Sequence, residues 1–224
     1  MRKQTLFITS IVLLAIILYS FKTPLIDGAN KNLNTNLDEK IERKVDSVLA
    51  LMRLNEKIGQ LVQYSGKWNA TGPSASNADK HKLNKLKNGE VGSMLNITSV
   101  ASIRETQKMV MDHSRLKIPL IFGYDVIHGY KTIFPIPLGE SASWDLEIIK
   151  KTAAIAAKET AASGIQWTFA PMIDISRDAR WGRVREGAGE DVCLSTVSGV
   201  ARVPGFHGGG LSLPSPIAPS SNPF

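Results

Sequence analysis

Two stretches of the sequence combine side chains that could bind a ligand rich in hydroxyl groups. Residues 123–129 read Gly-Tyr-Asp-Val-Ile-His-Gly. Asp125 follows an apolar stretch directly, and a carboxylate there is costly unless it has a partner or serves a ligand. Such a carboxylate can accept two hydrogen bonds from sugar hydroxyls. A simpler interpretation, which spacing alone favours, is that Asp125 caps the turn and His128 is a hydrogen-bonded core histidine.

A second polar stretch, residues 174–191, mixes arginines with carboxylates around a tryptophan. Arginine offers a forked pair of donors and Trp181 a flat apolar face, which together suit a sugar with polar edges and an apolar face. An internal network of salt bridges and a basic RNA-binding patch are the open alternatives, and the interleaved acidic residues argue against RNA. The arginines are Arg177, Arg180, Arg183 and Arg185, and the carboxylates are Asp174, Asp178, Glu186, Glu190 and Asp191.

Other kinds of catalytic site find little support in the sequence. A retaining glycosidase needs two carboxyl groups about 5–5.5 Å apart, but no spacing singles out such a pair. The nucleophile motif G-x-S-x-G is absent, and the single cysteine excludes an internal disulfide framework. The four histidines lack the H-E-x-x-H spacing of zinc hydrolases. We therefore predict neither a metal nor a cofactor.

Short apolar stretches alternate with longer helical patterns through the middle of the chain. This order predicts β/α units around a parallel sheet. No glycine-rich phosphate loop follows a predicted strand, which disfavours a dinucleotide-binding fold, whereas a TIM-type (β/α)8 barrel fits. Chemistry in such a barrel lies at the carboxyl ends of the strands, where Asn96, Asp125 and the stretch from Asp174 stand. The predicted strands cover residues 91–96, 119–124 and 165–173, and the predicted helices cover residues 102–115, 145–163 and 191–203.

Residues 1–29 have the composition of an export signal. Arg2 and Lys3 precede an apolar run of 16 residues from Leu6 to Phe21, which is the pattern of a secretory signal peptide. Because no clear small-x-small cleavage site follows, an uncleaved membrane anchor is the alternative. Both interpretations place the rest of the chain outside the cytoplasmic membrane, in the periplasm or secreted.

The remainder of the chain divides into three parts by composition. Residues 30–40 are polar and rich in asparagine, which predicts a solvated linker. Residues 41–207 form the predicted folded domain, which begins with two short helical patterns and a loop over residues 65–80. Residues 208–224 are rich in glycine, proline and serine and contain no charged residue, so we expect a disordered tail.

Several segments, in order along residues 41–207, resemble glycoside hydrolase family 3, and within it the exported bacterial β-glucosidases. Motifs of this length in this order are specific. The segments are EKIGQL (56–61), GSMLN (92–96), IPLIFGYDVIHG (118–129), TIFPIPLGESASWD (132–145), GIQWTFAPMIDISRDARWGR (164–183) and EGAGED (186–191).

The resemblance implies a fold, an activity and two site residues. The family's N-terminal domain is a (β/α)8 or similar barrel, and its enzymes release glucose or related sugars from the non-reducing ends of β-glucosides with retention. By position in the motifs, Asp125 and Arg183 correspond to residues that bind the terminal sugar. The implied partner is a small β-glucoside or an oligosaccharide, and no metal or cofactor is implied.

The chain also departs from the family pattern. Ala179 replaces a proline, Val192-Cys193 replaces Pro-Tyr, and Pro204 and His207 differ from the usual Lys-Gly-Phe-Gln-Gly. The family's nucleophile and acid/base residues come after the last matching segment. The resemblance therefore implies about three β/α units of an incomplete barrel and no hydrolysis by this chain alone.

Two alternatives to a β-glucosidase fragment remain at this stage. One is a sugar-binding remnant without catalysis. The other is a basic protein that binds nucleic acid or a membrane surface, which the net charge of +7 permits without requiring it.

Overall fold

A computed structural model describes residues 29–66, 76–208 and 217–220. The chain forms two compact units, one ending at Leu51 and one beginning at Met52. The predicted export signal lies almost wholly outside the described residues. Within the described part of the chain, no helix is both long enough and apolar enough to cross a membrane.

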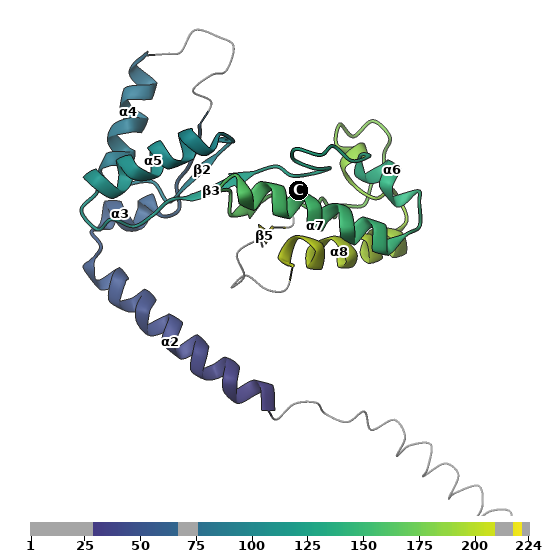
Figure 1. The fold of residues 1–224 in the computed structure, drawn as a ribbon, viewed down its shortest axis with the longest axis horizontal. Helices are drawn as coiled ribbons and strands as arrows, with labels where there is room; N and C mark the ends of the chain where they lie inside the picture. Colours follow the sequence, from purple (N-terminus) through teal and green to yellow (C-terminus); the bar gives the residue numbers. More distant parts are fainter. Residues whose placement is uncertain (1–28, 67–75, 209–216, 221–224) are drawn as a thin grey trace, which may run out of the picture. The chain divides into compact units, whose positions relative to one another are not determined.

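The described part of the first unit is a single helix, α2 (Ala29–Leu51) (Figure 1). Residues 30–40, predicted as a solvated linker, belong to the same helix as residues 41–51. Neither glycine nor proline interrupts this stretch, so nothing in the backbone chemistry ends the helix at residue 40. The division between the two units lies after this helix, between Leu51 and Met52.

The second unit is built on a parallel sheet of five strands, in the spatial order β1-β2-β3-β4-β5. The three predicted strands are confirmed as β2, β3 and β4, each shorter than predicted. Sheet order follows chain order, as in a partial (β/α)8 barrel. The expectation of about three β/α units is too low, because β1 and β5 were not predicted. The strands are β1 (Gln63–Ser65), β2 (Ser93–Leu95), β3 (Ile121–Tyr124), β4 (Trp167–Thr168) and β5 (Ala218–Pro219).

Helices connect and cover these strands (Figure 1). Asp145 caps the N-terminus of α7 by accepting hydrogen bonds from the backbone N–H groups of Glu147 and Ile148, and Asp191 caps α8 in the same way through Leu194. The predicted loop over residues 65–80 includes the start of α4. The helices are α3 (Leu54–Gly59), α4 (Ser76–Lys87), α5 (Val100–His113), α6 (Pro137–Ser141), α7 (Leu146–Ala162) and α8 (Val192–His207), with a 3₁₀ turn, η1 (Val184–Glu186).

Two apolar clusters hold the second unit together. The first lies around β2, β3 and α5 and includes the fully buried side chains of Met94 and Phe122. The second lies between β3, α7 and α8 and includes Val126 and Phe206. Because Val126 follows Asp125 directly, burial of Val126 in this second cluster fixes the chain beside the candidate carboxylate.

Part of the predicted disordered tail is ordered in the structure. The backbone N–H groups of Ala218 and Ser220 donate to the carbonyl oxygens of Gln166 and Thr168, both at 2.9 Å, and these bonds add β5 to β4. Ile217 is fully buried in the second apolar cluster. The expectation of disorder is therefore wrong for residues 217–220, whereas residues 209–216 and 221–224 lie outside the described part.

Candidate functional site

The loops that follow β3 and β4 meet around a cavity of about 510 Å³. The loop after β3 contributes Asp125, and the loop after β4 contributes Glu186. Both loops leave the carboxyl ends of parallel strands, which is the end where a barrel places its chemistry. The residues that line the cavity are Tyr124, Asp125, Ile127, His128, Gly129, Tyr130, Ile133, Ile136, Pro137, Gly182, Arg185 and Glu186.

Asp125 stands on a backbone that is held at the residue after it. The N–H of Val126 donates to Thr168 Oγ1 on β4 at 3.2 Å. The carboxyl of Asp125, by contrast, accepts no hydrogen bond from another described residue. The turn-capping interpretation therefore has no support in these contacts, and the carboxylate is exposed and able to accept hydrogen bonds from a ligand.

His128 is hydrogen-bonded, as the simpler interpretation of residues 123–129 predicts. Its ring Nδ1 lies 3.1 Å from the carbonyl oxygen of Phe134, and the N–H of Phe134 donates to the carbonyl of His128 at 2.8 Å. These bonds fold residues 128–134 into a compact loop, and Glu159 on α7 accepts three further hydrogen bonds from Lys131 and Thr132. His128 is thus a hydrogen-bonded histidine that shapes one wall of the cavity.

Burial and the neighbouring charges shift the pKa of Asp125 in opposing directions. Partial burial of the carboxyl raises the pKa of Asp125 above its ordinary value of 3.8. The positive charge of Arg183 lowers that pKa, and the negative charge of Glu186 raises it. Asp125 and Arg183, which come from different loops, therefore lie within electrostatic reach of each other.

Glu186 orients the side chain of Arg183, and this pairing was not predicted from the sequence. The Nε and Nη2 atoms of Arg183 donate to Glu186 Oε2 at 3.1 and 2.7 Å. This pairing raises the pKa of Arg183 above its ordinary value, and the charges of Asp125 and Asp174 act in the same direction. The spacing of three residues between the two partners was the available signal, because η1 brings such residues together.

Within the polar stretch, Gly182, Arg185 and Glu186 line the cavity, whereas Arg180, Trp181 and Arg183 do not. Arg180 pairs with Asp178 at 2.6 Å, and the arginine side chain is 90% exposed, so the salt-bridge interpretation describes this part of the stretch. Trp181 does not contribute the apolar face expected of it. The rings of Tyr124 and Tyr130, packed edge to face with centroids 5.7 Å apart, lie at the cavity instead.

Asn96, predicted at the end of a strand, lies outside this cavity lining. Its amide Nδ2 is 3.5 Å from Ser65 Oγ, so it links the ends of β1 and β2. No group of three or more acidic, histidine or cysteine side chains suited to a metal ion occurs among the residues that the structure describes.

Comparison with known proteins decides the family. Residues 53–218 match the family model described as the glycosyl hydrolase family 3 N-terminal domain. The chain belongs to glycoside hydrolase family 3. The matched range extends through residues 208–218, where the sequence motifs alone had indicated that the resemblance ends, and so it includes the first residue of β5.

Relatives of this family 3 chain include both curated proteins and solved structures. A periplasmic β-glucosidase of Salmonella typhimurium is 42% identical over 164 residues, or 73% of this chain. A β-glucosidase of Listeria innocua in complex with glucose superposes with a TM-score of 0.68 at 36% identity over 79% of this chain. A mutant of the Listeria enzyme in complex with laminaribiose gives a TM-score of 0.66 at 38% identity over 75% of this chain.

The family 3 chain is short beside these relatives. It spans 20% of the Salmonella protein and 26% and 24% of the two Listeria chains.

Proposed function

We propose that this chain carries the sugar-binding residues of a β-glucosidase, with Asp125 and Arg183 holding the terminal glucose. The observation that carries the proposal is that Asp125 lines a cavity at the carboxyl ends of β3 and β4. Arg183, 58 positions later in the sequence, does not line this cavity itself, but its positive charge acts on the Asp125 carboxyl and its partner Glu186 does line the cavity. The complex of the Listeria relative with glucose supports the choice of sugar.

The chemistry of the two side chains fits this role. The carboxylate of Asp125 can accept hydrogen bonds from two neighbouring hydroxyls, and hydrogen bonds to a charged group are stronger than neutral ones. The guanidinium of Arg183 can donate to a third hydroxyl while Glu186 fixes its orientation. Tyr124 and Tyr130 add apolar ring surface at the same cavity.

In the proposed mechanism of the longer relatives, two further carboxyl groups act on the glycosidic bond with retention of configuration. Within the described residues that line this cavity, the carboxylates are Asp125 and Glu186. Glu186 is paired with Arg183 and Asp125 is assigned to the sugar hydroxyls, so neither is available as a nucleophile. We therefore propose that this chain binds sugar without hydrolysing glycosides by itself.

Titration of the purified chain with glucose, followed by ¹H–¹⁵N NMR, tests this function. We expect saturable shifts of the amide signals of residues 124–130 and 182–186, with galactose as a control sugar. An aryl β-glucoside assay run beside it should show no turnover. A chain that folds but gives no saturable shift with glucose would contradict the proposed site, and turnover near that of a complete β-glucosidase would contradict the absence of catalysis.

The pKa of Asp125 predicts how binding depends on pH. Because burial raises this pKa, glucose affinity should be full above the raised value and should fall as the pH drops through it, since a protonated carboxyl accepts fewer hydrogen bonds. Removing the negative charge in Glu186→Gln should lower the pKa, and removing the positive charge in Arg183→Gln should raise it. The ¹³Cγ shift of Asp125 across a pH titration measures both changes. Equal titration curves in the two variants would contradict the proposed charge arrangement.

We further propose that the chain acts in the periplasm or after secretion. The cationic and apolar pattern of residues 1–29 and the periplasmic β-glucosidase of Salmonella support this location. Cell fractionation of the natural host tests it, and recovery of the chain in the cytoplasmic fraction alone would contradict it. Association with the membrane is expected only through an uncleaved N-terminal segment.

A further inference from the structure

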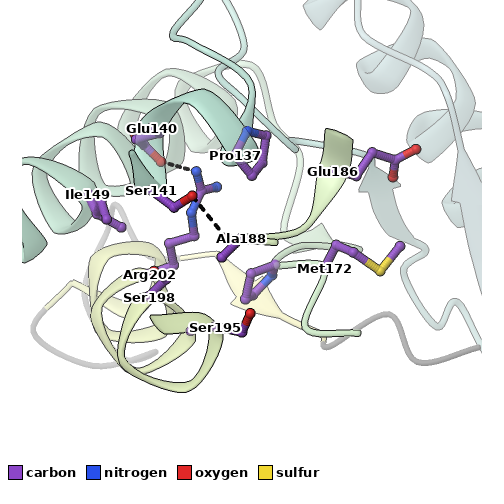
Figure 2. Close-up of a pocket in the computed structure, with 12 residues that line it drawn as sticks. Pro137, Glu140, Ser141, Ile149, Met172, Glu186, Ala188, Ser195, Ser198 and Arg202 are labelled. Atoms are coloured by element: carbon purple, nitrogen blue, oxygen red, sulfur yellow. Dashed lines mark hydrogen bonds and ion pairs between the residues drawn. The ribbon is translucent and has the colours of Figure 1, made fainter. Parts of the chain in front are cut away.

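A buried arginine on α8 lies behind the loop that carries Asp125. Arg202 is 7% exposed and forms an ion pair with Glu140 of α6, which is 4% exposed. Figure 2 shows the Arg202 side chain reaching from α8 toward Glu140, with the ion pair as a dashed line. Thr152 of α7 donates a hydrogen bond to the other carboxylate oxygen of Glu140, so side chains of three helices meet at this point.

The other terminal nitrogen of the Arg202 guanidinium bonds the backbone of the candidate site. Arg202 Nη1 donates to the carbonyl oxygen of Ile127 at 2.9 Å, two residues after Asp125. Together with the bond from the N–H of Val126 to Thr168 Oγ1, this contact fixes the peptide groups that follow Asp125 from two sides. Ile127 and His128 themselves line the candidate cavity.

We propose that Arg202 is a positioning residue for glucose binding, acting through the Ile127 carbonyl to hold the Asp125 loop in its binding geometry. This inference rests on the proposed function of Asp125. The forked guanidinium is suited to the task because one nitrogen bonds the Glu140 carboxylate while the other bonds the carbonyl.

A purely structural role for the Arg202–Glu140 pair explains this arrangement less well than a positioning role does. Buried ion pairs contribute little net stability, because the loss of hydration opposes the attraction between the charges. Burial lowers the pKa of Arg202 to about 10, so the guanidinium remains charged at neutral pH and needs its partner. Replacing both members with apolar residues of similar length leaves no charge unpaired and removes the contact with Ile127.

The test therefore uses the double variant Arg202→Met/Glu140→Met. We expect this variant to fold, to bind glucose at least tenfold more weakly, and to exchange the amide hydrogens of residues 126–129 faster. The matched control is Arg115→Met/Glu56→Met, which removes another arginine–glutamate pair, joined at 2.6 Å and absent from the cavity lining. The control should change the melting temperature and leave the glucose dissociation constant unaltered.

Binding and hydrogen exchange separate this inference from the proposed function. A folded Arg202→Met/Glu140→Met variant with unchanged glucose affinity and unchanged exchange would overturn the positioning role. If the natural chain binds no glucose, the proposed function fails, and exchange at residues 126–129 still decides whether Arg202 holds the loop. If the double variant does not fold, Arg202→Lys replaces it. A shorter side chain with one ammonium nitrogen then takes the place of the two guanidinium nitrogens that bond Glu140 and Ile127, so we expect the same two effects, each smaller.

Discussion

Replacing Asp125 with asparagine should weaken glucose binding by about 100-fold. The carboxylate accepts hydrogen bonds from two hydroxyls in the proposed complex, and each hydrogen bond to a charged group contributes roughly 1.5–3 kcal/mol. The asparagine amide keeps the shape of the side chain but offers a donor where the sugar also donates. The change is measured as the dissociation constant in an NMR or calorimetric titration with glucose.

Asp178→Asn provides the matched control for this prediction. Asp178 is another carboxylate, from the polar stretch of residues 174–191, but it pairs with the exposed Arg180 and does not line the cavity. Replacing Asp178 should leave the glucose dissociation constant within about twofold of the value for the natural chain, because an exposed ion pair contributes little. Equal losses of affinity in the two variants would show that glucose responds to the general charge of this region and not to Asp125.

The second large effect concerns stability. Gly205 lies where α8 packs against α7, and a Cβ atom there would stand 2.5 Å from the carbonyl oxygen of Lys150 and 2.7 Å from Ala153 Cβ. The backbone of α7 cannot yield as a flexible side chain can. Gly205→Ala should therefore lower the free energy of unfolding by about 1–3 kcal/mol, in the range of other overpacked cores. Urea unfolding followed by circular dichroism measures the loss.

Gly199→Ala, in the same helix, should have the opposite sign. A Cβ at Gly199 would meet Ile173 Cγ2 at 3.5 Å, an ordinary van der Waals contact. Alanine is also better than glycine in a helix by roughly 0.8–1 kcal/mol, so this variant should be slightly more stable than the natural chain. A Gly205→Ala variant as stable as Gly199→Ala would mean that α7 and α8 do not approach each other as closely as the structure shows.

The two candidate site residues differ in how far the sequence alone could single them out. Asp125 could be located because a polar residue directly after the apolar stretch that forms β3 marks the carboxyl end of a strand. Arg183 could be assigned only through the resemblance, since four arginines in the same polar stretch look alike by composition. Its partner Glu186 became distinct only when η1 brought the two side chains into contact.

Features that depend on tertiary contacts could not be predicted. Strand β5 has two residues, one of them proline, in a segment without strand periodicity. It is ordered because its backbone N–H groups donate hydrogen bonds to carbonyl oxygens at β4 and because Ile217 is buried in the second apolar cluster. The contact between Arg202 and the Ile127 carbonyl joins residues 75 positions apart, and no local pattern signals it.

A crystal structure of the chain with bound glucose tests the central claim most directly. The account predicts that two sugar hydroxyls lie within hydrogen-bonding distance of the Asp125 carboxylate and that another lies within reach of the Arg183 guanidinium. Glucose bound instead in the apolar hollow along α8, which is lined by Ile173, Val200 and Pro204, with an empty cavity beside Asp125, would contradict it.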